Sequence, residues 1–296
     1  MRPRQTETSA QGRGTSARFG SSGLWFASLI ALGVMVLVGI GLALLAPTLT
    51  DALDGTGRLI VGLGLAIVPA LLWLVFFYQQ DRLEPEPHHF VIGVFILGIL
   101  LGGAVEQPLI RDVFQAPRWL EPGTLTYLLG ATLLNGILTA SLAYAAVRFT
   151  VMKTDEFDEP VDGIIYATAA SLGLGVAANL GYITDNGTIS LGVGAVQIVI
   201  TSLAYATFGA VLGYFLGLVR PGGGPAFLVP LGVLAAGLLQ GLYQWIETQL
   251  GRGGLSYSPW PSLLATAFFT ALAFSLVFVL IGRSYTAADA RAARGA

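Results

Sequence analysis

The chain has 296 residues, of which 54% are hydrophobic and only 11% are charged, and its mean hydropathy is +0.74. Soluble domains carry charge on about a quarter of their residues, so this composition excludes a soluble globular protein and predicts a membrane protein. The formal net charge of −2 predicts no nucleic-acid partner, and the absence of a phosphate loop or dinucleotide fingerprint predicts no nucleotide. Cysteine is absent, which excludes disulfides, thiolate nucleophiles and cysteine-ligated metals.

Eight apolar stretches follow one another along the chain, and each reaches the roughly 20 residues that a helix needs to cross a bilayer. They cover residues 24–46, 59–78, 90–110, 125–148, 164–183, 189–219, 226–246 and 262–282. The stretch 189–219 predicts either one long tilted helix or a helix broken at a glycine. Because the stretches are continuously apolar and lack a period of two, we expect an all-α bundle of about eight transmembrane helices, not a β-barrel.

The ends of the chain differ from this transmembrane domain, which we place at residues 24–283. Residues 1–23 are rich in Ser, Thr, Gly and Arg and predict a disordered basic tail, while residues 284–296 predict a second tail. The first apolar stretch is too long for the core of a secretory signal, so we expect it to remain as a helix. With the N-terminus inside, eleven of the 15 Lys and Arg residues lie on the inner side, which predicts that both termini are cytoplasmic.

A charged, proline-containing corner, DRLEPEP, separates the second and third apolar stretches. Its motif residues are Asp81, Arg82, Glu84, Pro85, Glu86 and Pro87. Each proline disfavours helix at the preceding residue, so the segment predicts a rigid corner that ends with Pro87 in the first turn of the next helix. The alternative is a metal site that adds His88 and His89 to the corner carboxylates. Adjacent histidines point to different sides and lack the i, i+4 spacing of a chelate, so we predict no metal there.

This corner resembles the YxxDRxEPEP corner of the PrsW family of intramembrane proteases, which is related to the prenyl-protein CAAX endopeptidases. Residues 78–87 read YQQDRLEPEP, and residues 156–166, EFDEPVDGIIY, are similar to the family's turn into its next helix. With the order of the helices, the resemblance covers about residues 73–246. It implies a protein of a bacterial cytoplasmic membrane whose relatives cleave membrane-bound regulators such as anti-sigma factors.

Active members of the family are understood to carry Glu-Glu-x-x-Lys, Glu-Asn and two separate histidines on successive helices, which form a metal-dependent or carboxylate-based site that activates water. The residues at the matching positions here are Asn135, Gly136, Thr139, Ala178, Asn179, Tyr205 and Gln240. Of these, only Asn179 keeps the family's residue type. The resemblance therefore implies a PrsW-like fold whose catalytic residues are replaced, with no metal cofactor, and zinc is implied only for an active protease.

Glu106 is the one acidic residue that we place inside a predicted span. It lies four residues after Gly102, on the same helix face, with Asn135, Asn179 or Arg111 as candidate partners. Two interpretations stay open: a residual group that binds a proton or substrate, or a carboxyl group that hydrogen-bonds for helix packing. We expect four side chains to converge in the bundle interior: Asn135, Ala178, Tyr205 and Gln240. We also expect a polar network of Asn179, Tyr182, Tyr205 and Gln240.

Three functions compete on this evidence. The first is a catalytically degenerate PrsW-like protein that acts as a scaffold in the lipid bilayer or binds transmembrane segments of other proteins. The second is an active intramembrane endopeptidase with a relocated site, in which Glu106 is the base and Asn135 and Gln240 donate to the oxyanion. The third is a transporter, which a single intramembrane acid and the lack of an inverted repeat disfavour.

Overall fold

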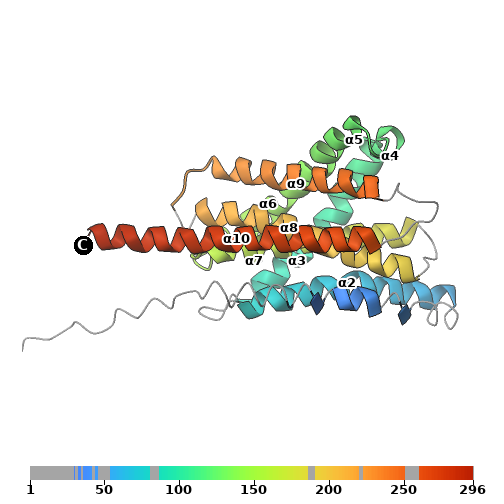
Figure 1. Ribbon diagram of the computed structural model, residues 1–296, viewed down its shortest axis with the longest axis horizontal. Coiled ribbons are helices and arrows are strands. Elements are labelled where there is room, and N and C mark those ends of the chain that lie inside the picture. The colour runs from blue at the N-terminus through green and yellow to red at the C-terminus, as the bar shows by residue number, and fades with distance from the viewer. Residues whose placement is uncertain are drawn as a thin grey trace, which may run out of the picture.

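The computed structural model in Figure 1 describes residues 54–80, 87–185, 191–219, 223–250 and 260–295, together with scattered positions between 30 and 45. Every regular element in this part of the chain is a helix. The elements are α2 (Gly55–Gln80), α3 (His88–Leu101), η1 (Gly102–Glu106), η2 (Leu109–Val113), α4 (Ala116–Trp119), α5 (Leu125–Gly130), η3 (Ala131–Ile137), α6 (Leu138–Thr150), α7 (Pro160–Asp185), α8 (Leu191–Val219), α9 (Leu228–Leu250) and α10 (Trp260–Gly295). The elements η1, η2 and η3 are π-helical turns within longer helices.

Six helices in the described part of the chain are long and apolar enough to cross a membrane. They are His88–Trp119, Leu125–Thr150, Pro160–Thr184, Gly194–Val219, Leu228–Leu250 and Trp260–Val277. A shorter apolar helix, Ile60–Val75, lies within α2 and corresponds to the expected second span. Most of the first expected span and the whole tail 1–23 lie outside the described residues. The all-α, multi-pass architecture is confirmed, and the long stretch 189–219 forms the single helix α8.

Helices α7 and α8 form the centre of the bundle and are almost entirely buried. Helix α7 packs against α2, α3, α6 and α8, and α8 also packs against α9 and α10. In Figure 1 these inner helices lie between α9 on one side and α2 on the other. Small residues allow this packing: a Cβ added to Gly213 of α8 would lie 2.3 Å from the carbonyl oxygen of Gly163 in α7. The two backbones are therefore in direct contact, as is common between membrane helices.

The EFDEPVDGIIY segment folds into a turn that fixes the start of α7. The buried carboxylate of Asp162 accepts hydrogen bonds from the backbone N–H groups of Asp158 at 3.0 Å and Glu159 at 2.6 Å. The ring of Phe157 stacks on that of Tyr166, with centroids 6.2 Å apart. Acidic side chains at a helix N-terminus satisfy backbone donors that otherwise have no partner, so this part of the sequence has a structural role.

The DRLEPEP corner is described only at its last residue, Pro87, which directly precedes α3. The carbonyl oxygen of Pro87 accepts a hydrogen bond from the backbone N–H of Phe90 at 2.9 Å, which closes the first turn. The other five motif residues lie outside the described residues. At the opposite end of the chain, α10 continues as a helix to Gly295, through the segment expected as a tail.

Both termini are expected on the cytoplasmic side, because of the distribution of basic residues. The chain lacks cysteine, so single cysteines introduced at Ser16 and Ala287 report accessibility without background. In intact cells, a membrane-impermeant maleimide should label neither position until the membrane is permeabilised. Labelling of both positions in intact cells would reverse the topology, and labelling of one alone would give an odd number of spans.

Candidate functional site

Three fully buried polar side chains from three helices meet in the middle of the bundle. Glu106 ends the π-helical turn η1, Thr139 lies in the first turn of α6, and Gln240 lies in α9; each is 1% exposed. The Thr139 hydroxyl donates to Oε1 of Glu106, and Nε2 of Gln240 donates to Oγ1 of Thr139 at 3.4 Å. Tyr205 of α8 lies close enough to Thr139 and Glu106 to interact electrostatically with both. We call Glu106, Thr139, Tyr205 and Gln240 the central cluster.

The hydroxyl group of Thr139 links other side chains of the central cluster through hydrogen bonds. A hydroxyl group has one hydrogen to donate and two lone pairs that accept. Its hydrogen goes to Glu106, and one of its lone pairs accepts from the N–H of Gln240. One small side chain thus joins α6 to η1 and to α9. Thr139 stands at the position that matches the lysine of the family's Glu-Glu-x-x-Lys.

Two of the elements around the central cluster are π-helical. Segment η1 ends with Glu106, and η3 precedes Thr139 and contains Asn135 and Gly136. A π-helical turn contains an extra residue, so it rotates the side chains that follow relative to a continuous α-helix, and such turns are frequent at functional sites. The helical spacing used to align side chains from the sequence therefore does not hold through these two segments.

At Gly136, which we align with the second acid of the family motif, two backbones are in contact. A Cβ added to Gly136 would lie 2.1 Å from the carbonyl oxygen of Gly237 in α9. One turn along α9, a Cβ added to Gly241 would lie 2.0 Å from Oγ1 of Thr132. Segment η3 and helix α9 are therefore pressed together along these glycines. No side chain, and in particular no carboxylate, has room at position 136 in this arrangement.

The two remaining positions from the family motifs, Ala178 and Asn179, make no side-chain hydrogen bond with the central cluster among the described residues. Ala178 in α7 is half-buried, and Asn179 is buried and donates to the backbone carbonyl of Ile198 in α8 at 3.4 Å. Asn135 lies beside the central cluster, where its Nδ2 donates to Oε1 of Gln244 at 2.7 Å. The structure thus brings Tyr205 and Gln240 together, places Asn135 next to them, and directs Asn179 to the backbone of α8.

The expected partners of Glu106 need correction. Among the described residues, the hydrogen-bond partner of Glu106 is Thr139, not Asn135, Asn179 or Arg111. Asn135 is one turn away from Thr139 on the same transmembrane helix and lies inside the π-helical turn η3, whereas Thr139 lies in α6. Arg111 instead lies against α7, where a Cβ added to Gly181 would be 3.1 Å from its guanidinium group.

The candidate membrane spans of the structure contain more acids than the one expected: Glu106, Asp112, Asp162 and Glu247. The predicted span ended at Ile246, whereas α9 continues to Leu250 and includes Glu247 within a candidate membrane span. Glu247 Oε1 accepts a hydrogen bond from Nε2 of Gln197 in α8 at 3.3 Å. The sequence does contain a signal for this residue, because Gln240, Gln244 and Glu247 follow one another at spacings of four and three and so share a helix face.

The donor set of the central cluster does not fit a catalytic zinc ion. Zinc in catalytic sites takes three protein ligands from His, Cys, Asp or Glu. The central cluster supplies one carboxyl group, one hydroxyl, one amide and one phenol, and the described residues contain no group of three or more His, Cys, Asp or Glu side chains that could hold a metal. His88 and His89 lie at the start of the span that contains Glu106, in the first turn of α3.

The fold and its polar centre define a multi-pass α-helical protein of the membrane. A sequence model described as "PrsW family intramembrane metalloprotease" matches residues 86–281, which is more than half of the chain. The chain therefore belongs to the PrsW family. The match includes every helix that contributes to the central cluster.

Several curated relatives carry the name "Protease PrsW". The protein from Geobacillus kaustophilus is 28% identical over 195 residues, which cover 64% of this chain and 80% of that protein. The Bacillus subtilis protein is 29% identical over 188 residues, covering 63% of this chain and 82% of that protein. The Oceanobacillus iheyensis protein is 28% identical over 209 residues, covering 68% and 90%. No solved structure matches the chain.

Proposed function

We propose that this PrsW-family protein binds transmembrane segments of other membrane proteins without cleaving them. Hydrolysis of a peptide within the membrane needs a base that activates water and an electrophile that stabilises the developing oxyanion. The central cluster offers one carboxyl group, Glu106, whose Oε1 already accepts from Thr139. The family's second acid, its lysine and both histidines are replaced by groups without a charge, so we expect no metal cofactor.

The contact between Gly136 and Gly237 is the observation that carries this proposal. It fills the position of a family carboxylate with backbone, at 2.1 Å for a hypothetical Cβ. A degenerate site that had lost only its reactive groups would leave space where they stood. Here the backbone of Gly237 in α9 occupies that space, which supports a site that serves helix packing instead of catalysis.

One observation favours a second function, that of an active endopeptidase with a relocated site. Oε2 of Glu106 and Oε1 of Gln240 are both buried and have no hydrogen-bond partner among the described residues. A water molecule between them would have an acceptor for its proton in Glu106. The phenol of Tyr205 and the amide N–H of Gln240 would then be the donors available to an oxyanion.

Site-specific photo-crosslinking in native membranes tests the binding function. Leu238 lies in α9 two residues before Gln240 and is 52% exposed, and Phe268 in α10 is 72% exposed. A photoreactive residue at Leu238 should give a defined adduct with an intact apolar segment of another membrane protein, whereas the matched residue at Phe268 should give lipid adducts. Lipid adducts at both positions, or the same protein adducts at both, would contradict the proposal.

A further inference from the structure

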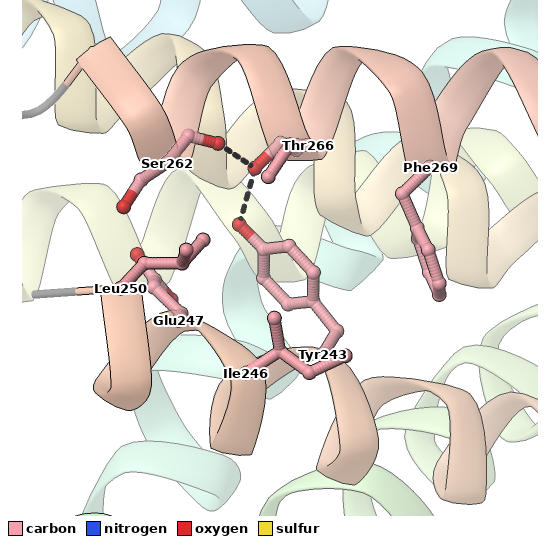
Figure 2. Close-up of a pocket in the computed structure, with 8 residues that line it drawn as sticks. Tyr243, Ile246, Glu247, Leu250, Ser262, Thr266 and Phe269 are labelled. Carbon is pink, nitrogen blue, oxygen red and sulfur yellow. Dashed lines mark hydrogen bonds between the residues drawn. The ribbon is translucent and has the colours of Figure 1, made fainter.

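Glu247, an acid within the candidate membrane span of α9, lies near one end of that helix at a small pocket (Figure 2). The pocket lies between α9 and α10, and its polar groups include Glu247, Ser262, Thr266 and Tyr243. The hydroxyl of Tyr243 shares a hydrogen bond of 2.8 Å with that of Thr266, which in turn donates to the backbone carbonyl of Ser262 at 2.6 Å. The volume of about 30 Å³ is enough for water but not for a peptide.

A stripe of polar side chains on α9 leads from this pocket to the central cluster. Gln240, Gln244 and Glu247 share one helix face, and Gln240 and Gln244 pair with residues of the antiparallel segment η3–α6. Gln240 bonds Thr139 at 3.4 Å, and Gln244 bonds Asn135 at 2.7 Å. Glu247 accepts from Gln197 of α8 and lies near the phenol of Tyr127 in α5. We call Asn135, Gln240, Gln244 and Glu247 the polar stripe. Seven residues of helix separate its ends, which is about 10 Å.

The unpartnered buried atoms along this path are all hydrogen-bond acceptors. Within the described residues, they are Oε2 of Glu106, Oε1 of Gln240 and Oδ1 of Asn135. A buried acceptor without a donor costs about 1–3 kcal/mol, so three together are unfavourable. A proton on Glu106 converts one of the three acceptors into a donor, and bridging water molecules supply donors to the others.

The charged and titratable groups around Glu106 do not supply the missing donors. On its own helix, Arg111 lies against Gly181 of α7. From α8, Tyr205 is the titratable group that lies near Thr139 and Glu106. From α6 and α9 the facing groups are the neutral side chains of Thr139 and Gln240. The surroundings of Glu106 therefore favour an added proton over an exposed negative charge, because a carboxylate is costly to bury without a positive partner.

We propose that Glu106 is a proton-binding site that exchanges its proton with water at the Glu247 end of the membrane, through water molecules held along the polar stripe. Loading adds one proton from water to Oε2 of Glu106, and release returns it to water, so no other bond is made or broken. Proton exchange at Glu106 requires no peptide cleavage, so it can be measured whether the protein binds transmembrane segments or cleaves them. We assign the exchange to the Glu247 end because the pocket beside Glu247 is large enough for water, and because the polar stripe runs from there to Gln240, which bonds Thr139 next to Glu106.

Infrared spectroscopy of the full-length protein in lipid vesicles, transferred from H₂O to D₂O, tests this proposal. A protonated carboxyl group has its own C=O stretching band, which is assigned to Glu106 by its loss in Glu106→Gln. In the wild type this band should shift in D₂O without unfolding. In the double variant Asn135→Leu/Gln244→Leu the shift should be about tenfold slower or more, because exchange then needs local opening of the bundle. The variant Gln249→Leu, which changes an exposed residue off the stripe, should exchange like the wild type.

Three outcomes would overturn the proposal. One is the absence of any protonated-carboxyl band that Glu106→Gln removes. The second is an equal exchange rate in the wild type and the double variant. The milder variant Glu247→Gln covers the case in which the double variant does not fold, since it preserves the side-chain shape but removes the acid at the pocket. An exchange rate in Glu247→Gln equal to that of the wild type would be the third contradicting result.

Discussion

Replacing Gly213 with leucine should destabilise the protein strongly, by about 3 kcal/mol or more. The new Cβ would lie 2.3 Å from the carbonyl oxygen of Gly163 and 2.5 Å from Cα of Ile164. These are backbone atoms of α7, so no side chain can rotate away and α7 and α8 must move apart. The measurement is the thermal unfolding midpoint of the purified protein in detergent.

The matched control for Gly213→Leu is Gly93→Leu in α3. A Cβ added to Gly93 meets nothing within 4 Å, and the residue is exposed. The same change of residue type there should leave the unfolding midpoint close to that of the wild type, and a better helix former can even raise it slightly. Equal losses at both positions would mean that the contact between α7 and α8 is not what limits stability.

Replacing Thr139 with valine should produce the second large effect, because valine has the shape of threonine but cannot hydrogen-bond. The change leaves Oε1 of Glu106 and Nε2 of Gln240 without their partner in a buried position. Each group left unsatisfied costs roughly 1–3 kcal/mol. The measurement is again the unfolding midpoint in detergent.

Two further variants distinguish the loss of the Thr139 hydrogen bonds from the general effect of changing threonine to valine. Thr150→Val removes a hydroxyl that bonds only carbonyl groups of its own helix, at Ala146 and Val147, and should change stability by about 0.5 kcal/mol or less. The double variant Thr139→Val/Glu106→Leu should be more stable than Thr139→Val alone. Removing both hydrogen-bonding partners costs less than leaving one of them buried without a partner. A double variant that is less stable than Thr139→Val by the full cost of Glu106→Leu would argue against the bond between the two residues.

The fold was largely predictable because membrane helices are encoded by long apolar runs. The spans from residue 90 onward appear as helices close to their expected bounds, and 189–219 is continuous. The end of α9 was missed because Glu247 interrupts the apolar run, although its side chain finds a partner in Gln197 and the helix continues. A charge ends a stretch defined by hydropathy, but it does not end a helix.

The site was predictable at the level of helices and less so at the level of side chains. The alignment of family motifs led to Thr139, Tyr205 and Gln240, which do meet. The partner of Glu106 was not predictable from helical spacing, because the turns η1 and η3 are π-helical. From the sequence we could only align Gly136 with an acid of the family motif. Its backbone contact with Gly237 depends on how two helices far apart in the sequence pack, which the sequence does not reveal.

The most direct test of the central claim is to incubate the purified protein with a panel of transmembrane peptides and to measure its bound metal at the same time. The wild type, Glu106→Gln and the double variant His88→Ala/His89→Ala are compared under identical conditions. The proposed binding function predicts no cleavage above the blank in any of the three and no stoichiometric metal. Reproducible cleavage by the wild type that Glu106→Gln abolishes would contradict this account, and would establish the relocated endopeptidase site instead.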